Sequence, residues 1–178
     1  MKLYVIRHGQ TKCNKENKYN CRLDEDINEI GIKQAEEASK IVENLDIDLI
    51  ICSPMIRTKH TCEIVNVNNI PVIYDERIME RDGGVLTNTI IDDYYITDYY
   101  NYYSTNIPEG LETLPELFNR IHTFIDDIKE KYSDKNILLV THGAVARTIK
   151  YYFEPLPEDG LILNTCGQKN CEVKEYEL

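Results

Sequence analysis

Long apolar runs are absent from the 178-residue sequence, and this absence excludes a chain built around membrane-spanning helices. Such a helix needs about 20 consecutive apolar residues, and no stretch approaches that length. The first residues, Met1-Lys2-Leu3, lead into a short β-rich run instead of the apolar core of a secretory signal. We therefore expect a cytoplasmic protein with no membrane partner.

Basic residues are scarce relative to acidic ones. The chain has 20 Lys and Arg against 31 Asp and Glu, which gives a formal net charge of −11. Proteins that bind a phosphate backbone need clustered cations, so nucleic acid is not an expected partner. The sequence leaves the oligomeric state open.

The six cysteines form no C-x-x-C pair. A chain of this length, 42% hydrophobic, buries roughly two-thirds of its unfolded surface and needs no disulfide or metal to hold it. We expect reduced thiols. Cys166 and Cys171 are close in sequence, but no histidine pair lies near them, so a metal site is not expected there.

Short β-rich runs alternate with helical patterns along the chain. Strands are predicted at about 2–6, 47–52, 70–73, 136–141, 161–165 and 171–176. Helices are predicted at about 29–45, 54–66, 88–103, 113–132 and 144–153. Strands separated by helices pair in parallel through right-handed crossovers. The sequence thus predicts an α/β fold, a three-layer helix–sheet–helix sandwich with a mostly parallel central sheet.

One segment interrupts this alternation. Residues 92–104 read DDYYITDYYNYYS, a composition unlike the rest of the chain, and we expect them to belong to a small helical lid inserted at about 81–112. No repeat or Pro/Gly-rich boundary divides the chain, so residues 1–178 are expected to form a single domain. After the lid, Thr113 and Glu116 form a capping-box pattern at the start of the next helix.

Charged side chains gather just after the predicted strands. In parallel α/β sheets, ligands bind beyond the carboxyl ends of the strands, so these positions are the first candidates for a site. Two of the four histidines end apolar strands, and a glycine follows each of them. The strand ends carry Arg7-His8-Gly9, Ser53 with Arg57, Glu80-Arg81 and His142-Gly143.

These residue types suit an anion. Arg7 and Arg57 each offer a planar fork of N–H donors that matches phosphate oxygens. A glycine after each histidine lets the backbone approach a ligand, and its N–H can join the donors. A lone histidine after a strand is more often structural than catalytic, but the neighbouring arginines favour a catalytic role. The sequence therefore predicts an anion pocket that contains His8 and His142.

The same residues follow a known pattern. In order, they read Arg7-His8-Gly9-Gln10-Thr11-x-x-Asn14, Asp24, Gly31-x-x-Gln34-Ala35, Ser53-x-x-x-Arg57-Thr58, Glu80 and Thr141-His142-Gly143. Gly110-Leu111-Glu112-Thr113 is followed seven residues later by Arg120. From residue 3 to about 150, the sequence resembles the histidine phosphatase superfamily, in its phosphoglycerate mutase-like branch 1.

The resemblance implies a role for each catalytic candidate. His8 is the expected nucleophile, which attacks phosphorus in line and forms a phosphohistidine that water then hydrolyses. Arg7, Arg57 and His142 are expected to balance the charge of the transferred phosphoryl group. Glu80 is the expected proton donor to the leaving oxygen. No metal or other cofactor is implied.

The loops around this pocket supply the expected substrate contacts, namely Thr11, Asn14, Cys21, Arg81 and Gly143. Asp82 and Glu76 are the alternatives to Glu80 as the acid. Where many family members carry tryptophan and glycine, this chain has Cys13 and Cys21, in the loop expected to border the phosphate. Their thiols are either buried and inert or form a redox-sensitive entrance.

The predicted lid carries no lysine or arginine between Asp82 and Asn119. Apart from Arg81, its wall should therefore repel anions, and we expect hydrolysis of a phosphomonoester whose remainder is neutral or cationic. The tyrosines of the lid either stack on a substrate ring or pack the lid onto the body. His60 and His122 end no strand and are expected to be surface or packing residues.

Three functions follow from these observations. The expected one is a metal-independent phosphomonoesterase that acts through a phosphohistidine on a small phosphorylated metabolite. The first alternative is a phosphoglycerate mutase, which the acidic lid disfavours. The second is a non-catalytic phosphate-binding or regulatory protein, which the intact set of catalytic candidates disfavours.

Overall fold

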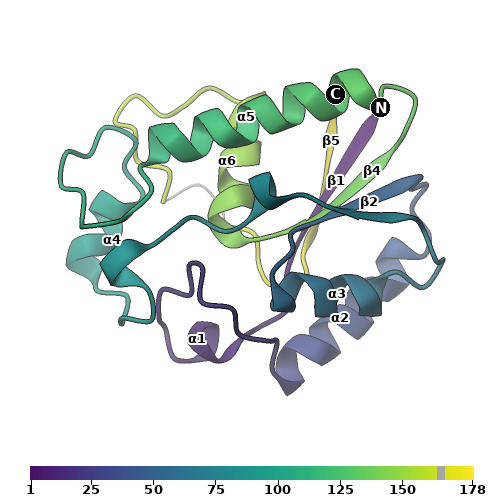
Figure 1. Cartoon of the computed structure of the whole chain (residues 1–178), viewed down its shortest axis with the longest axis horizontal. Coiled ribbons are helices and arrows are strands. Elements are labelled where there is room, and N and C mark those ends of the chain that lie inside the picture. The colour runs from purple at the N-terminus through teal and green to yellow at the C-terminus, as the bar shows by residue number, and fades with distance from the viewer. Residues whose placement is uncertain (164–166) are drawn as a thin grey trace.

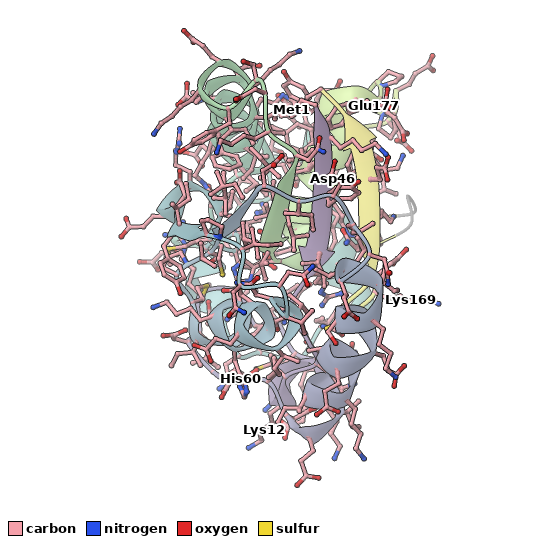
Figure 2. The ribbon with its side chains drawn as sticks, turned by 90° about the vertical axis from the view of Figure 1, so that its right-hand side faces the viewer. Met1, Lys12, Asp46, His60, Lys169 and Glu177 are labelled. Atoms are coloured by element: carbon pink, nitrogen blue, oxygen red, sulfur yellow. The ribbon has the colours of Figure 1, made fainter. Side chains whose placement is uncertain are left out.

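Five strands form the central sheet of the structure, a computed structural model that describes residues 1–163 and 167–178, without the side chains of residues 93–95. They are β1 (Lys2–Arg7), β2 (Leu49–Cys52), β3 (Val72–Tyr74), β4 (Ile137–Thr141) and β5 (Val173–Glu177), in the spatial order β3-β2-β4-β1-β5. The first four pair in parallel, and β5 runs antiparallel to β1. Figure 2 shows this reversal, because Met1 and Glu177 lie at the same end of the sheet. The predicted, mostly parallel sheet is confirmed.

Helices cover both faces of this sheet (Figure 1). One face is covered by α5 (Leu114–Lys131) and α6 (Gly143–Phe153), and the other by α2 (Glu29–Val42) and α3 (Ile56–Val65). The connections hold α1 (Lys12–Lys15), α4 (Asp93–Tyr99) and the 3₁₀ turns η1 (Glu76–Ile78) and η2 (Gly84–Leu86). The predicted three-layer sandwich is confirmed. Over residues 1–163 and 167–178, no helix is both long enough and apolar enough to cross a membrane.

The sheet divides the core in two because successive side chains of a strand point to opposite faces. Leu3 and Val5 of β1 join the apolar cluster under α5 and α6, whereas Tyr4 and Ile6 join the cluster under α2 and α3. β2 and β4 divide their side chains in the same way. Strands buried on both faces read as continuous apolar runs, which explains why they were visible in the sequence.

The start of α5 also follows its sequence pattern. The Oγ1 atom of Thr113 accepts a hydrogen bond from the Glu116 N–H at 3.3 Å, and the Glu116 carboxylate accepts one from the Thr113 N–H at 2.8 Å. The predicted capping box is therefore confirmed. It places the helix directly after the lid segment.

The helix predicted at 88–103 is shorter in the structure, where α4 covers only Asp93–Tyr99. Backbone groups before α4 bond to the loop after α1 instead of forming a helical turn. The Asn88 N–H donates to the Tyr19 carbonyl at 2.7 Å, and the Ile91 N–H donates to the Asn17 carbonyl at 2.9 Å. The positive φ of 65° at Asn88 also interrupts a helix.

The strand predicted at 161–165 is wrong over its described part. Leu161 makes an isolated antiparallel bridge with Asn101 of the lid, and residues 162 and 163 belong to no strand. The remaining two positions, 164 and 165, lie outside the described residues. The place beside β1 is taken by β5, so this apolar run packs against the lid connection instead of extending the sheet.

The backbone of the loop after β1 packs directly against the backbone at the start of α2. A Cβ on Gly31 would lie 2.4 Å from the Gln10 carbonyl oxygen, and a Cβ on Gly9 would lie 2.6 Å from the Gly31 carbonyl oxygen. Asn28 adds a polar tie, because its Oδ1 accepts from the Gly31 N–H and its Nδ2 donates to the Thr11 carbonyl. Glycine at these two positions therefore brings the end of β1 close to α2.

Gly31→Ala should lower the free energy of unfolding by about 1–3 kcal/mol, because the added methyl group meets fixed backbone atoms. Lys33→Ala, an exposed change on the same helix, should alter it by less than about 0.5 kcal/mol. Urea denaturation of both variants measures the difference. Equal stability of the two would show that the crossing is not a tight packing constraint.

Candidate active site

The two strand-end histidines meet because β1 and β4 are neighbours in the sheet. Arg7 pairs with Thr141 in the register, and the His8 N–H continues the pairing by donating to the Thr141 carbonyl at 2.9 Å. His8 and His142 therefore leave the sheet at the same level, where β1 runs toward α1 (Figure 1). Their ring centroids are 5.3 Å apart, with the ring planes at 60°.

His8 has one ring nitrogen in a defined role. Its side chain is buried, with 2% of its surface exposed, and Nδ1 lies 2.7 Å from the Gly9 carbonyl oxygen. A carbonyl only accepts, so Nδ1 carries the proton and Nε2 carries the lone pair. Burial lowers the pKa of His8 well below its ordinary value, and the charges of Arg57 and Arg7 lower it further. The ring is thus a neutral imidazole that could act as a nucleophile.

His142 is buried behind this ring. Its Nε2 lies 2.7 Å from the Oγ of Ser53, the residue that follows β2. Its Nδ1 is buried and has no hydrogen-bond partner within the described part of the chain. Burial lowers the pKa of His142 well below its ordinary value, followed by the charges of Arg57 and of His8. A second neutral ring therefore lines the same centre.

Two arginines supply the positive charge beside the rings. Arg57 is fully buried and donates to the carbonyls of Leu23 and Cys21, each at 2.7 Å. Arg7 donates from Nη1 to the Gln168 carbonyl at 3.0 Å. In the residues described, the Nε atoms of both arginines are buried without an acceptor. Leaving a buried donor unpaired costs roughly 1–3 kcal/mol, so an anion at this position would be well matched.

Glu80 reaches the same place from the loop after η1. Its Oε1 atom accepts from its neighbour's backbone, the Arg81 N–H, at 3.0 Å and from the Ala144 N–H at 3.2 Å. Ala144 lies in the first turn of α6, the helix that begins directly after His142. The carboxylate is therefore held beside the histidine pair. The two alternative acids, Asp82 and Glu76, do not line the cavity described next.

A cavity of about 100 Å³ opens beside these groups. Its lining comprises Arg7, His8, Asn14, Lys18, Tyr19, Asn20, Cys21, Glu80, Ile91, Tyr99, Tyr100, Gly143, Arg147, Gly167 and Gln168. Of the expected substrate contacts, Asn14, Cys21 and Gly143 border it. Of the catalytic candidates, Arg7, His8 and Glu80 line the cavity. Arg57 and His142 do not line it, but Arg57 acts on His8 through its charge and His142 through the ring contact.

Two expected substrate contacts lie elsewhere. Thr11 is buried as the N-cap of α1, and its Oγ1 accepts from Asn20 Nδ2 at 2.9 Å. Arg81 is buried with 1% of its surface exposed, and its guanidinium lies 4.3 Å from the centroid of the Tyr99 ring. It donates to the carbonyls of Glu112 and Tyr99. Arg81 therefore joins the start of the lid segment to α4 and to the end of that segment, and it does not border the cavity.

The cavity wall carries two cations that the sequence interpretation missed. Lys18 comes from the loop after α1, and Arg147 comes from α6. The expectation of a wall without positive charge considered only the lid segment, whereas the wall is built from other parts of the chain. One signal was present, because Arg147 follows Gly143 by four residues, one helical turn, and so shares its face of α6.

Some lid tyrosines pack onto the body, and others line the cavity. Tyr99 packs onto the body through Tyr19, with ring centroids 4.7 Å apart, and Tyr102 packs onto Phe118 at 5.1 Å. Tyr100 lines the cavity, as Tyr99 also does. The side chains of Tyr94 and Tyr95 lie outside the description.

The remaining two histidines lie away from the cavity, as expected. His60 pairs with Asp26 on the surface, with Nδ1 2.9 Å from Oδ1, and it is labelled at the outer face of the molecule in Figure 2. His122 packs between Phe118 and Tyr152, with ring centroids 5.4 Å and 5.3 Å away.

The thiols of Cys13 and Cys21 are buried, and burial is the main cause that raises the pKa of each to about 11. A thiol that stays protonated is a poor redox partner, so the structure favours inert thiols over a redox-sensitive entrance. Cys166 lies outside the described residues. Among those described, no three His, Cys, Asp or Glu side chains gather as a metal ion would require.

The lowered pKa values of His8 and His142 predict that both rings remain neutral at about pH 6, below the ordinary value of 6.5. A lowered pKa means that the ring takes up its proton only at more acidic pH. Imidazole nitrogen chemical shifts, measured by NMR and assigned from single His→Gln variants, report the charge of each ring. Protonation of either ring with a midpoint near 6.5 would contradict this interpretation.

Comparison with known proteins agrees with this arrangement. The chain is 27% identical to a protein named uncharacterized phosphatase PhoE from Bacillus subtilis, over 98% of this chain and 93% of that one. It is 30% identical to a probable phosphoglycerate mutase GpmB from Yersinia pestis, over 98% and 86%. The solved structure titled Bacillus stearothermophilus YhfR superposes with a TM-score of 0.88 at 26% identity, over 99% of this chain and 91% of that one. The family model of the histidine phosphatase superfamily (branch 1) matches residues 3–178, and the chain belongs to that superfamily.

Proposed function

We propose that the chain is a phosphomonoesterase that hydrolyses a small phosphorylated metabolite through a phosphohistidine at His8. The observation that carries the proposal is the hydrogen bond between Nδ1 and the Gly9 carbonyl. It leaves Nε2 as an unprotonated nucleophile in a ring that the charges of Arg57 and Arg7 influence. Similarity to a named phosphatase over nearly the whole chain supports the same activity.

In the first step, the Nε2 lone pair of His8 forms a bond to phosphorus while the bond from phosphorus to the leaving oxygen breaks. The protonated carboxyl of Glu80 gives its proton to that oxygen, so the alcohol leaves neutral. Arg7 and Arg57 hold the charge that spreads over the equatorial oxygens.

In the second step, a water molecule attacks the phosphohistidine. The Glu80 carboxylate removes the proton of this water, the phosphorus–nitrogen bond breaks, and its electron pair returns to His8 Nε2. Inorganic phosphate leaves, and the carboxyl is again protonated for the next cycle. Because the arginines supply the countercharge, the proposed reaction is independent of metal.

Phosphoglycerate mutase activity is the alternative, and similarity to the GpmB protein favours it. A mutase must retain a bisphosphorylated intermediate while that intermediate turns over against the phosphohistidine. Arg7 and Arg57 would hold one phosphate of that intermediate, and Lys18 is already paired with Glu16. Arg147 is then the remaining cation of the described lining for a second phosphate, which supports hydrolysis.

His8→Ala should lower the turnover of an aryl phosphate by at least about 10³-fold, because the nucleophile is removed. Assays in EDTA should leave wild-type turnover unchanged, since no metal takes part in the proposed steps. His60→Ala, a surface histidine, serves as the matched control and should keep wild-type activity. A folded His8→Ala protein with wild-type turnover would overturn the proposed mechanism.

With 3-phosphoglycerate as substrate, release of inorganic phosphate should exceed conversion to 2-phosphoglycerate, because the described cavity wall offers few cations to hold the second phosphate of the intermediate. Coupled assays for both products, with and without added 2,3-bisphosphoglycerate, measure the two rates. Conversion faster than phosphate release would favour the mutase instead.

A further inference from the structure

The cavity beside His8 contains more positive charge than the proposed phosphoryl transfer uses. Three cationic residues line it, namely Arg7, Lys18 and Arg147, and Glu80 is the one acidic residue among the described lining residues. Arg7 has a proposed role on the transferred phosphoryl group, but Lys18 and Arg147 have none. Their presence is notable because the chain as a whole has a net charge of −11.

The guanidinium of Arg147 is held in one orientation. Its Nη1 donates to the carbonyls of Ile162 and Leu163 at 3.2 Å and 3.0 Å, and its Cζ lies 4.9 Å from the centroid of the Tyr100 ring. These two carbonyl groups and the Tyr100 ring help to orient the guanidinium. A fixed cation loses little conformational entropy when it binds an anion, which favours binding.

The backbone beside Arg147 makes room for this group. A Cβ on Gly167 would lie 2.3 Å from Arg147 Nη2, so a side chain at this position would displace the guanidinium. Gly167 and Tyr100 both line the cavity. The guanidinium is therefore enclosed between the lid and the segment that precedes β5.

Arg147 and Arg7 both line the cavity beside His8, and their charges interact. Burial is the main cause that lowers the pKa of Arg7, the charges of Glu80 and Tyr100 raise it, and the Arg147 charge lowers it by a smaller amount. Two like charges in one cavity repel each other, and a ligand with two anionic groups would relieve this repulsion. Lys18 adds a third cation, half-buried and 2.8 Å from Glu16 through its Nζ.

We propose that Arg147, assisted by Lys18, binds a carboxylate of the substrate while Arg7 and Arg57 hold its phosphate. The substrate would then be a small phosphomonoester that carries a carboxylate close to the ester carbon. A carboxylate matches the planar fork of a guanidinium. This inference rests on the proposed phosphatase activity, and it replaces the expectation of a neutral or cationic remainder.

Matched substrate pairs test the inference. O-phosphoserine differs from phosphoethanolamine by one carboxylate, and 2-phosphoglycolate differs in the same way in charge from ethyl phosphate. The wild-type enzyme should have a kcat/KM roughly 10- to 100-fold higher for the carboxylate member of each pair, the range expected for a charged hydrogen-bonded contact. A ratio near one, with measurable hydrolysis of both members, would overturn the inference and leave the phosphatase activity standing.

Variants assign the preference to residues. Arg147→Met should bring the ratio close to one, Lys18→Met should reduce it by a smaller factor, and Arg147→Lys should restore part of it. The ratio is measured on one preparation, so a partly unfolded variant does not bias it. An unchanged ratio in Arg147→Met would overturn the role of this residue.

Lys12→Met provides the matched control. Lys12 is on α1 near Lys18, but its side chain is 76% exposed and points to solvent at the outer edge of the molecule in Figure 2. Its substitution should leave the ratio at the wild-type value. If neither an aryl phosphate nor any of the four substrates is hydrolysed, the proposed function itself fails, an outcome distinct from a ratio near one.

Discussion

The hydrogen bond from His8 Nδ1 to the Gly9 carbonyl is the interaction on which the proposed chemistry depends, because it determines which ring nitrogen is free. The backbone of Gly9 makes two further contacts that hold it in place. Its N–H donates to Thr61 Oγ1 of α3 at 3.0 Å, and its Cα lies against the backbone of Gly31 in α2. The tautomer of the proposed nucleophile therefore depends on how two helices pack under the sheet.

Buried positive charge is the second constraint on the site. Arg57 has no exposed surface, and its partners include two backbone carbonyls. Two neutral imidazoles beside it cost less than charged ones would, because they add no further repulsion. The carboxylate of Glu80 raises the pKa of Arg57 and so offsets part of its desolvation. The centre is thus arranged for an incoming anion, which supplies the remaining countercharge.

The sequence predicted those features that depend on local patterns. Apolar strands buried on both faces, the capping box at Thr113, and the gathering of His8 and His142 at neighbouring strand ends all follow from periodicity and topology. The structure agrees with each of them. The Glu80 carboxylate also lies next to the histidine pair, in keeping with the family resemblance.

What could not be predicted depends on contacts between distant segments. The helix expected at 88–103 is shortened because its first residues bond to the loop after α1. Leu161 pairs with Asn101 of the lid and not with the sheet. The charge of the cavity wall was misjudged for the same reason, since Lys18 and Arg147 lie about 130 residues apart in the chain and meet only after folding.

The position of β5 has a consequence for the order in which the protein can form. β1 precedes every other described strand in the chain, but its two neighbours, β4 and β5, follow it by more than 130 residues. Asn170 Nδ2 donates to the His8 carbonyl at 2.8 Å, and Arg7 donates to the Gln168 carbonyl. During synthesis, β1 therefore has no strand to pair with until β4 and β5 have emerged from the ribosome. Neither the sheet nor the pocket is complete before then, so the His8 loop reaches its final contacts only after the segment that carries β5 has been synthesised.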